Sequence, residues 1–198
     1  MFPNLQYFES LKEKINLRLN ELAKRNRISS ENVESQIVDY PWLYGALDKV
    51  PAEVSFICEN PSLSGVKNAH IYTIDGGSPD IEAQWWGGKA RLFRVALYQM
   101  NLKNTRPNER GGWECFITNV VKQINIAKDQ EALSLVERRQ QAIDWAEVLQ
   151  WELAHVKPKY IFCVGGKAFS AIQWLRQKEY LMVDAPVYKI MHYSARYK

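Results

Sequence analysis

A short apolar run that breaks abruptly into polar residues and a proline constrains this chain more than any other stretch. Val54–Cys58 reads VSFIC, which is too short for a helix and has the length and composition of a buried parallel strand. Glu59-Asn60-Pro61-Ser62 follows at once. Proline cannot continue a central strand, and it keeps the preceding Asn60 out of the helical region. The run is therefore either an ordinary strand exit or the edge of a binding site, since open α/β sheets bind ligands past the carboxyl ends of their strands.

Helical and strand-like segments alternate along the rest of the chain. Apolar residues at helical spacing predict helices, which cover Phe2–Arg27, Lys89–Asn101, Gln130–His155 and the stretch from Gly165 to about Lys178. Short apolar runs predict strands at Val54–Cys58, Trp113–Val121, Tyr160–Val164 and Val187–Met191. Tyr40–Leu47 is predicted as one short helical turn. The alternation predicts an α/β fold, a three-layer α/β/α sandwich with a central four-stranded parallel sheet.

Length and composition bound the class of protein. A chain of 198 residues with 46% hydrophobic and 24% charged residues has the size and make-up of one soluble globular domain, which we expect to span residues 1–198 as a monomer. No apolar run approaches the roughly 20 residues that span a membrane, and no signal-peptide pattern opens the chain. We therefore expect an intracellular, cytoplasmic protein. The net charge of +4 favours an anionic partner.

Cysteine usage argues against a metal site. Cys58, Cys115 and Cys163 are isolated from one another, and each lies in an apolar, strand-like run. The sequence has no CxxC spacing and no cysteine paired with a nearby histidine. We therefore expect three small, buried hydrophobic side chains, and neither a metal ion nor an iron–sulfur cluster.

Each predicted strand ends in polar residues or glycines. Glu59-Asn60 follows the first strand, Thr118-Asn119 lies at the end of the second, Gly165-Gly166-Lys167 follows the third, and His192 follows the fourth. Because the carboxyl ends of parallel strands share one edge of the sheet, we expect these residues to form a site. The alternative for each of them is an ordinary exit from a strand.

The glycine turn and the histidines limit which ligands and which reactions this site is expected to have. Gly165-Gly166-Lys167 matches neither a P-loop nor a GxGxxG fingerprint, but glycines at a helix N-terminus expose amides to a phosphate, and Lys167 adds a charge. A plain tight turn is the alternative. A hydrolytic triad is not supported, because the sequence has no GxSxG elbow and neither His70 nor His155 has a nucleophile beside it. His192 differs from both because it follows a strand in a short polar tail.

Taken in order, these segments resemble the uracil-DNA glycosylase superfamily. The matching blocks run from Val54 to Arg196, and they are Cys58-Glu59-Asn60-Pro61-Ser62, Trp86-Gly87-Gly88-Lys89-Ala90, Phe116-Ile117-Thr118-Asn119-Val120-Val121-Lys122, Lys157-Pro158-Lys159 with Gly165-Gly166-Lys167-Ala168, and His192-Tyr193-Ser194. No single block is specific, but the ordered set is. The resemblance implies a hydrolase that releases a base from DNA after flipping the base out of the stack.

The resemblance also implies a role for each block. The base-binding residues would be Trp86, Asn119 and Pro61, with Trp86 stacking on the base and Asn119 pairing with its edge. Asn60 or Glu59 would position the attacking water, and His192 would donate a hydrogen bond to the departing base as negative charge develops there. The DNA-binding residues would be Gly165, Gly166, Lys167, Ser194 and Arg196. No cofactor or metal is implied.

The C-terminal tail departs from the pattern of the family. Tyr193 replaces the usual proline, and the chain ends soon after Arg196, where relatives continue into a further helix. Residues 193–197 would therefore serve as the loop that fills the gap left by the flipped base, without a helix behind them. We expect a preference for single-stranded or mispaired DNA, whose bases take the least free energy to flip.

Other departures keep alternatives open. Cys58 and Ser62 stand where the family usually has glycines, and Glu59-Asn60 combines features of two branches, which leaves the water-positioning residue undecided. One alternative is a glycosylase for a different, modified base, including one in foreign DNA, with Trp85-Trp86 shaping its pocket. Another is a catalytically silent nucleic-acid-binding module on the same fold. An unrelated α/β nucleotide-binding enzyme is disfavoured by the failed phosphate motifs.

Overall fold

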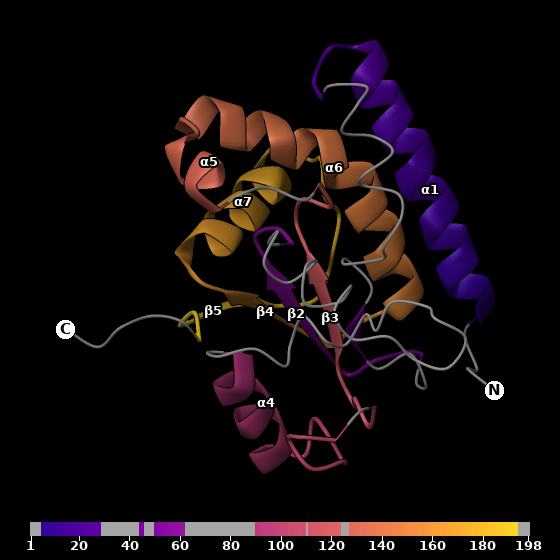
Figure 1. Cartoon of the computed structure of the whole chain (residues 1–198), viewed down its shortest axis with the longest axis vertical. Coiled ribbons are helices and arrows are strands. Elements are labelled where there is room, and N and C mark those ends of the chain that lie inside the picture. Colours follow the sequence, from indigo (N-terminus) through magenta and orange to yellow (C-terminus); the bar gives the residue numbers. More distant parts are fainter. Residues whose placement is uncertain are drawn as a thin grey trace.

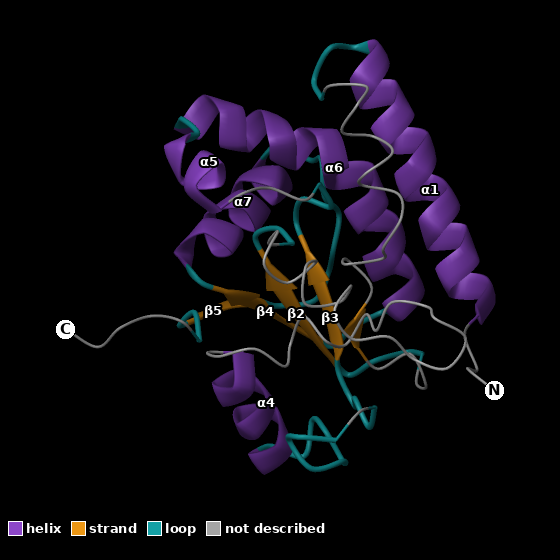
Figure 2. Ribbon diagram, in the orientation of Figure 1, coloured by secondary structure: helices purple, strands orange, loops and turns teal. Residues whose placement is uncertain are grey.

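The computed structural model describes residues 5–28, 44–45, 50–61, 90–109, 111–123 and 127–193. In these ranges the chain forms an α/β sandwich in which one sheet lies between two layers of helices (Figure 1). Figure 2 shows the same arrangement coloured by secondary structure. The predicted fold class is confirmed.

The sheet contains the four predicted strands, and these are all parallel. They are β2 (Val54–Cys58), β3 (Phe116–Asn119), β4 (Tyr160–Val164) and β5 (Val187–Ile190), in the spatial order β3-β2-β4-β5. The chain passes from β2 to a neighbour on one side and then crosses to β4 on the other side. The strand order therefore reverses beside β2, and such a reversal opens a crevice at the carboxyl ends of the strands.

An edge strand replaces the helical turn predicted at Tyr40–Leu47. Tyr44–Gly45 forms β1, which pairs antiparallel with β3, with Tyr44 opposite Ile117 and Gly45 opposite Phe116. The prediction for this segment is wrong, because a local aromatic pattern carries no information about a pairing partner distant in the sequence. The neighbouring residues 40–43 and 46–47 lie outside the described residues.

The predicted strand Trp113–Val121 is longer than β3. Trp113 pairs instead with Lys103 in an isolated antiparallel bridge. Beyond Asn119 the chain leaves the strand, and the N–H groups of Val120 and Val121 donate to the carbonyl oxygens of Cys58 and Glu59, at 2.9 and 3.0 Å. The end of β3 is thus bonded to the segment that follows β2.

Helices cover both faces of the sheet (Figure 1). On one face lies α4 (Ala90–Gln99), and on the other lie α6 (Leu135–Val156) and α7 (Gly166–Gln177), with α1 (Leu5–Lys24) packed along α6. These helices confirm the predictions, with ends that differ by a few residues. Within the described ranges, no helix is long and apolar enough to cross a membrane.

The long helix predicted over Gln130–His155 is two helices. The first, α5, spans Ala127–Ala132, and α6 begins at Leu135. Ser134 caps α6: its hydroxyl accepts the Glu137 N–H at 3.3 Å, and the Glu137 carboxylate accepts the Ser134 N–H at 2.7 Å. These hydrogen bonds hold the pKa of Glu137 below its usual value. The Ser-x-x-Glu spacing is a capping box, a helix start that is visible in the sequence.

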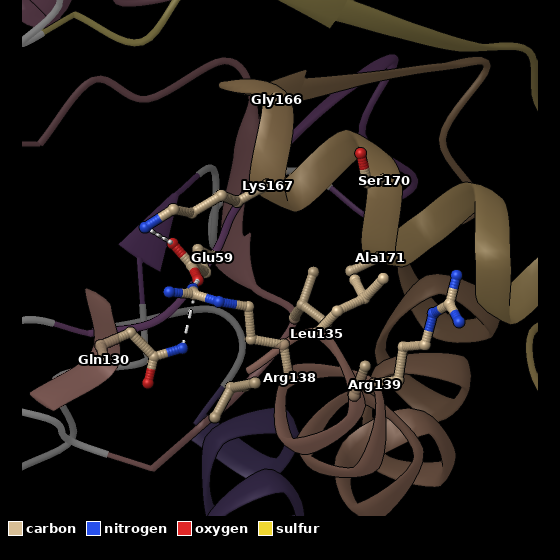
Figure 3. Close-up of a pocket in the computed structure, with 12 residues that line it drawn as sticks. Glu59, Gln130, Leu135, Arg138, Arg139, Gly166, Lys167, Ser170 and Ala171 are labelled. Atoms are coloured by element: carbon tan, nitrogen blue, oxygen red, sulfur yellow. Dashed lines mark hydrogen bonds and ion pairs between the residues drawn. The ribbon is translucent and has the colours of Figure 1, made fainter. Parts of the chain in front are cut away.

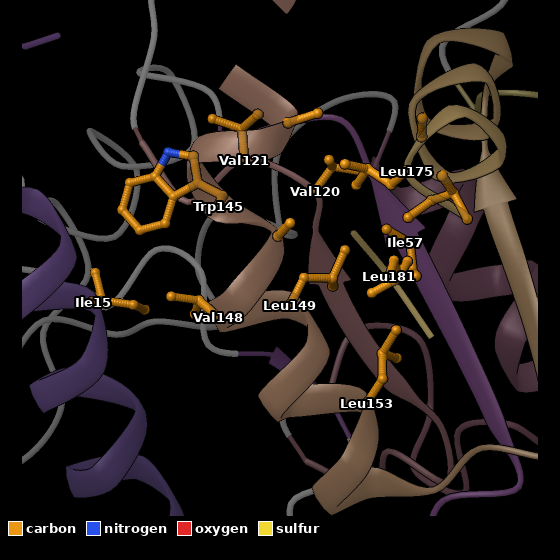
Figure 4. Close-up of a cluster of buried hydrophobic side chains, with 14 of the residues drawn as sticks. Ile15, Ile57, Val120, Val121, Trp145, Val148, Leu149, Leu153, Leu175 and Leu181 are labelled. Carbon is orange, nitrogen blue, oxygen red and sulfur yellow. The ribbon is translucent and has the colours of Figure 1, made fainter. Parts of the chain in front are cut away.

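Two apolar layers hold the helices to the sheet. Figure 4 shows the larger one, where Trp145, Val148, Leu149 and Leu153 of α6 lie between α1 and the sheet residue Ile57. The smaller one packs Phe93 and Leu97 of α4 against the opposite face of β2. All three cysteines are buried and free, as predicted, and burial raises the pKa of the Cys58 thiol to about 12.

Candidate active site

The polar ends of the strands meet at the carboxyl edge of the sheet, as the parallel topology requires. Cys58, the last residue of β2, lies opposite Asn119, the last residue of β3. Val164 and Ile190 end β4 and β5 opposite each other, and the Gly165 N–H donates to the Ile190 carbonyl at 2.9 Å. The structure therefore brings together the segments that carry the predicted residues Glu59, Asn60, Asn119, Gly165 and His192.

Glu59 is the centre of a charged cluster at this edge (Figure 3). Its Oε1 accepts hydrogen bonds from Arg138 Nη1 at 2.5 Å and from Gln130 Nε2 at 3.1 Å. Its Oε2 lies 3.9 Å from Lys167 Nζ. The Glu59 side chain is 24% exposed. The carboxylate thus ties the segment after β2 to α5, to the first turn of α6 and to the start of α7. Sequence reasoning missed Arg138 and Gln130, because nothing in their spacing relates them to Glu59.

A pocket of about 240 Å³ lies beside this cluster, between the N-terminal ends of α6 and α7 (Figure 3). Its apolar lining comes from Val120, Val121, Leu135, Ala142 and Ala171. Arg138, Arg139 and Lys167 supply positive charge, of which the Glu59 carboxylate in the same lining offsets part, and Gly166 places the first turn of α7 in its wall. Amides at a helix N-terminus together with cationic side chains favour an anion, so the predicted phosphate-binding turn lies in a suitable electrostatic setting.

Asn60 and Pro61 follow Glu59 at the edge of the sheet. The Asn60 amide nitrogen donates to the Pro61 carbonyl at 2.9 Å, which leaves Oδ1 as the atom of this side chain that can accept a hydrogen bond from water. Asn60 is half-buried and Pro61 is buried. Asn119 is 4% exposed at the end of the neighbouring strand.

Two stacked rings support His192. Its imidazole stacks on Tyr193, with centroids 4.3 Å apart, and Tyr193 stacks on Phe93 of α4, with centroids 5.5 Å apart. Burial raises the pKa of Tyr193 well above its usual value, so the phenol stays neutral. On another side His192 packs on Gly165, where a Cβ would lie 3.3 Å from the His192 Cβ. Tyr193, the residue in place of the family proline, is part of this stack.

Gly165 combines an unusual backbone with close contact to the histidine. Its φ of 94° and ψ of 162° lie in a region that is essentially restricted to glycine. We expect Gly165→Ala to lower the free energy of unfolding by about 1–3 kcal/mol and to displace the imidazole. Denaturant titration and base-release rates measure the two effects. Gly166→Ala is the matched stability control, since a Cβ there meets nothing within 4 Å. Equal stability of both variants would contradict the backbone argument.

A buried ion pair beneath Asn119 is the largest feature that sequence reasoning missed. Lys122 and Glu152 of α6 are both 0% exposed. Lys122 Nζ donates to Thr118 Oγ1 at 2.6 Å, to the Asn119 carbonyl at 2.7 Å and to Glu152 Oε2, while Thr118 Oγ1 donates to Glu152 Oε1 at 2.9 Å. The available signal was Glu152 itself, a carboxylate in the apolar stripe of a helix, which requires a buried partner.

Several predicted residues lie outside the described ranges. These are Ser194, Arg196 and all of residues 62–89, which include His70 and Trp86. His155 lies in the last turn of α6, as expected from the sequence, and is exposed. Within the described part of the chain, no group of three or more histidine, cysteine, aspartate or glutamate side chains is placed to hold a metal ion.

The fold and the polar residues at the carboxyl edge of the sheet together define a class of protein. This class is the doubly wound α/β proteins, which have a ligand site where the strand order reverses. The family model described as the Uracil DNA glycosylase superfamily matches residues 45–197. The chain therefore belongs to the uracil-DNA glycosylase superfamily, and the resemblance predicted from the sequence is confirmed. Membership indicates glycosylase chemistry on DNA. No match to the chain was found among the curated proteins.

Proposed function

We propose that this protein is a DNA glycosylase that hydrolyses the N-glycosidic bond of uracil, or of a related damaged or modified base, flipped out of DNA. The observation that carries the proposal is the placement of His192. The histidine packs on Gly165 at the same edge of the sheet as the segments carrying Asn60 and Asn119. A donor, an amide that can accept from water and a base-pairing amide are the groups that this hydrolysis needs.

In this proposal Asn60, rather than Glu59, positions the attacking water. Glu59 is engaged by Arg138 and Gln130 and lies near Lys167, so its oxygens already have partners. The Asn60 side chain uses its nitrogen for the Pro61 carbonyl and keeps Oδ1 for water. The water oxygen bonds to C1′ of the sugar and one water proton passes to the solvent, while the base leaves as an anion with the electron pair of the broken N-glycosidic bond. His192 stabilises the negative charge that develops on the base oxygen.

Base recognition and DNA binding fall to the neighbouring groups. Asn119 pairs with the edge of the base, Pro61 lines its pocket and Trp86 stacks on it. The amide of Gly166 and the ammonium group of Lys167 hold flanking phosphates, supported by the cationic setting of the pocket beside Glu59. Gly165, whose own N–H donates to the Ile190 carbonyl, forms the turn that presents them to the DNA. Ser194 and Arg196 extend this DNA contact in the proposal.

A panel of oligonucleotides tests the function directly. Each carries one uracil or one modified base, and alkali cuts the strand wherever a base has been released. Release of at least one base by the wild-type protein, and its loss in His192→Ala, is the expected result. DNA binding without release of any base would instead identify a catalytically silent module on the same fold. Release confined to modified bases, with none from uracil, would identify a glycosylase for a modified base.

Asn119→Asp is expected to change base preference. An amide that pairs with a uracil-like edge is left unpaired by the wrong base, at a cost of about 1–3 kcal/mol. The carboxylate should therefore weaken release of uracil and admit cytosine-like bases. The rates for uracil and cytosine, measured side by side in both proteins, check this. An unchanged preference in a folded variant would make Asn119 a strand-end residue without a role in recognition.

Single-stranded and mispaired targets are expected to react faster than well-paired ones. Tyr193, the first residue after the histidine, stacks on Phe93 and His192, so this ring does not serve as a wedge in a duplex. Unpairing a base costs a few kcal/mol, and least in a mismatch or a single strand. Single-turnover rates on the same lesion in a single strand, in a mismatch and in a matched duplex test the order. Equal rates, or the fastest rate on the matched duplex, would refute it.

A further inference from the structure

The buried pair of Lys122 and Glu152 is an unusual way to hold a core together. Both side chains are fully buried, and removing two charges from water costs more than their attraction usually returns. Apolar residues of similar volume commonly stabilise such a position as well or better. Fold stability alone therefore does not explain why charges occupy this place, and their contacts suggest what does.

All three N–H bonds of the Lys122 ammonium group have acceptors, two at the end of β3 and one on α6. They are Thr118 Oγ1, the Asn119 carbonyl and the Glu152 carboxylate, which also accepts from Thr118. Glu152 belongs to the long helix α6, so the network fixes the last residues of β3 to a rigid element. An apolar pair would fill the same volume without holding the backbone at Asn119.

The same few residues connect to the neighbouring catalytic segment. Directly after Asn119, the N–H groups of Val120 and Val121 donate to the carbonyls of Cys58 and Glu59. Asn60 directly follows Glu59 in the chain. Two groups therefore depend on where the end of β3 lies: Asn119, which is proposed to recognise the base, and the segment after β2, which is proposed to position water.

We propose that Lys122 and Glu152 are positioning residues that hold Asn119 in register with the base and thereby set which base the enzyme releases. The inference rests on the proposed function. Neither residue touches the base; both act through the backbone and side chains of the β3 end. Selectivity for an amide-recognised edge depends on the placement of that amide, because a misplaced amide pairs less well with the right base and excludes the wrong base less strictly.

The test compares the full-length wild-type protein with a double variant, Lys122→Met with Glu152→Leu. Replacing both charges together avoids leaving one charge buried alone, so the double variant should fold. The matched control is Glu53→Gln with Lys159→Gln, which removes an ion pair of 3.3 Å between exposed side chains at the amino ends of β2 and β4. Amide hydrogen exchange and release rates over the base panel are measured for all three proteins.

Hydrogen exchange tests whether Lys122 and Glu152 position the end of β3, and this test does not require the protein to release a base. In the double variant, exchange of the Val120 and Val121 amides should rise by about tenfold, while the Gly165 amide, which bonds β5, stays unchanged. Unchanged exchange at Val120 and Val121 would overturn the proposal. Equal acceleration at all three amides would overturn it as well, because that pattern indicates general destabilisation.

Base selectivity tests whether the position of Asn119 sets which base is released. The ratio of the release rates for the preferred and the rejected base should fall by about tenfold in the double variant and stay at the wild-type value in the control. A double variant with faster local exchange and an unchanged ratio would overturn the specificity role. A wild-type protein that releases no base would refute the proposed function, and with it the specificity role, while the exchange data would still report on the positioning of Asn119.

Discussion

Base release by His192→Ala is expected to be at least about a hundredfold slower than by the wild-type protein, with DNA binding retained. A hydrogen-bond donor aimed at charge that develops only in the transition state contributes about 3–4 kcal/mol to the rate. In the structure, the stack on Tyr193 and the contact with Gly165 hold the imidazole in place before substrate arrives. Such a preorganised donor loses little free energy to reorientation, which is why the expected loss is large.

The measurement is a single-turnover rate with excess enzyme, accompanied by fluorescence anisotropy for DNA binding. Asn60→Ala should show a loss of similar size, since it removes the group that we propose orients water. His155→Ala is the matched control, because this exposed histidine lies in the last turn of α6, beside Trp151 and Tyr7. Near-normal rates in both His192→Ala and Asn60→Ala would show that the proposed mechanism is wrong.

Lys122→Met alone is expected to destabilise the protein by about 3–5 kcal/mol, because it leaves the Glu152 carboxylate buried without its cation. Denaturant titration measures the loss. The double variant Lys122→Met with Glu152→Leu should recover most of it, since no buried charge remains. A single variant as stable as the wild type, or a double variant worse than the single one, would contradict this account of the pair.

The destabilisation should also depend on pH. Burial raises the pKa of Glu152, and in the single variant the attraction of Lys122 no longer opposes that effect. The folded variant then binds a proton more tightly than the unfolded chain. Its defect should be smallest below about pH 4, the range of an ordinary glutamate, and should grow as the pH rises through the folded-state pKa. Unfolding curves at several pH values check the sign, and a defect that shrinks with rising pH would contradict it.

Local patterns in the sequence were sufficient to predict the fold. Val54–Cys58 and Tyr160–Val164 are strands with the predicted bounds, because a short apolar run closed by proline or glycine has few other solutions. The break before α6 was missed although its signal is local, since Ser134 and Glu137 form a capping box. β1 was predicted wrongly because its structure depends on pairing with β3.

The candidate site was predictable only in part. The polar ends of parallel strands must share one edge, so Glu59, Asn119 and Gly165 could be placed there from the sequence. The partners of these residues could not, because Arg138 and Glu152 come from helices whose rotation is set by packing. For this reason the sequence did not distinguish Glu59 from Asn60 as the residue that positions the attacking water. In the folded chain the contacts of Glu59 favour Asn60 for that role.

The ring stack under His192 has a consequence for attempts to change the base preference of this protein. Phe93 begins the stack, and it lies in the first turn of α4. Residues 62–89, which include Trp85-Trp86, directly precede this helix in the sequence. Exchanging residues 62–89 for the corresponding segment of a relative is one route to new substrates. A transplanted segment that shifts or rotates the start of α4 would tilt Phe93, then Tyr193, then the imidazole. Grafts should therefore end before Ala90 and be screened first for an undisturbed histidine, and only then for the new base.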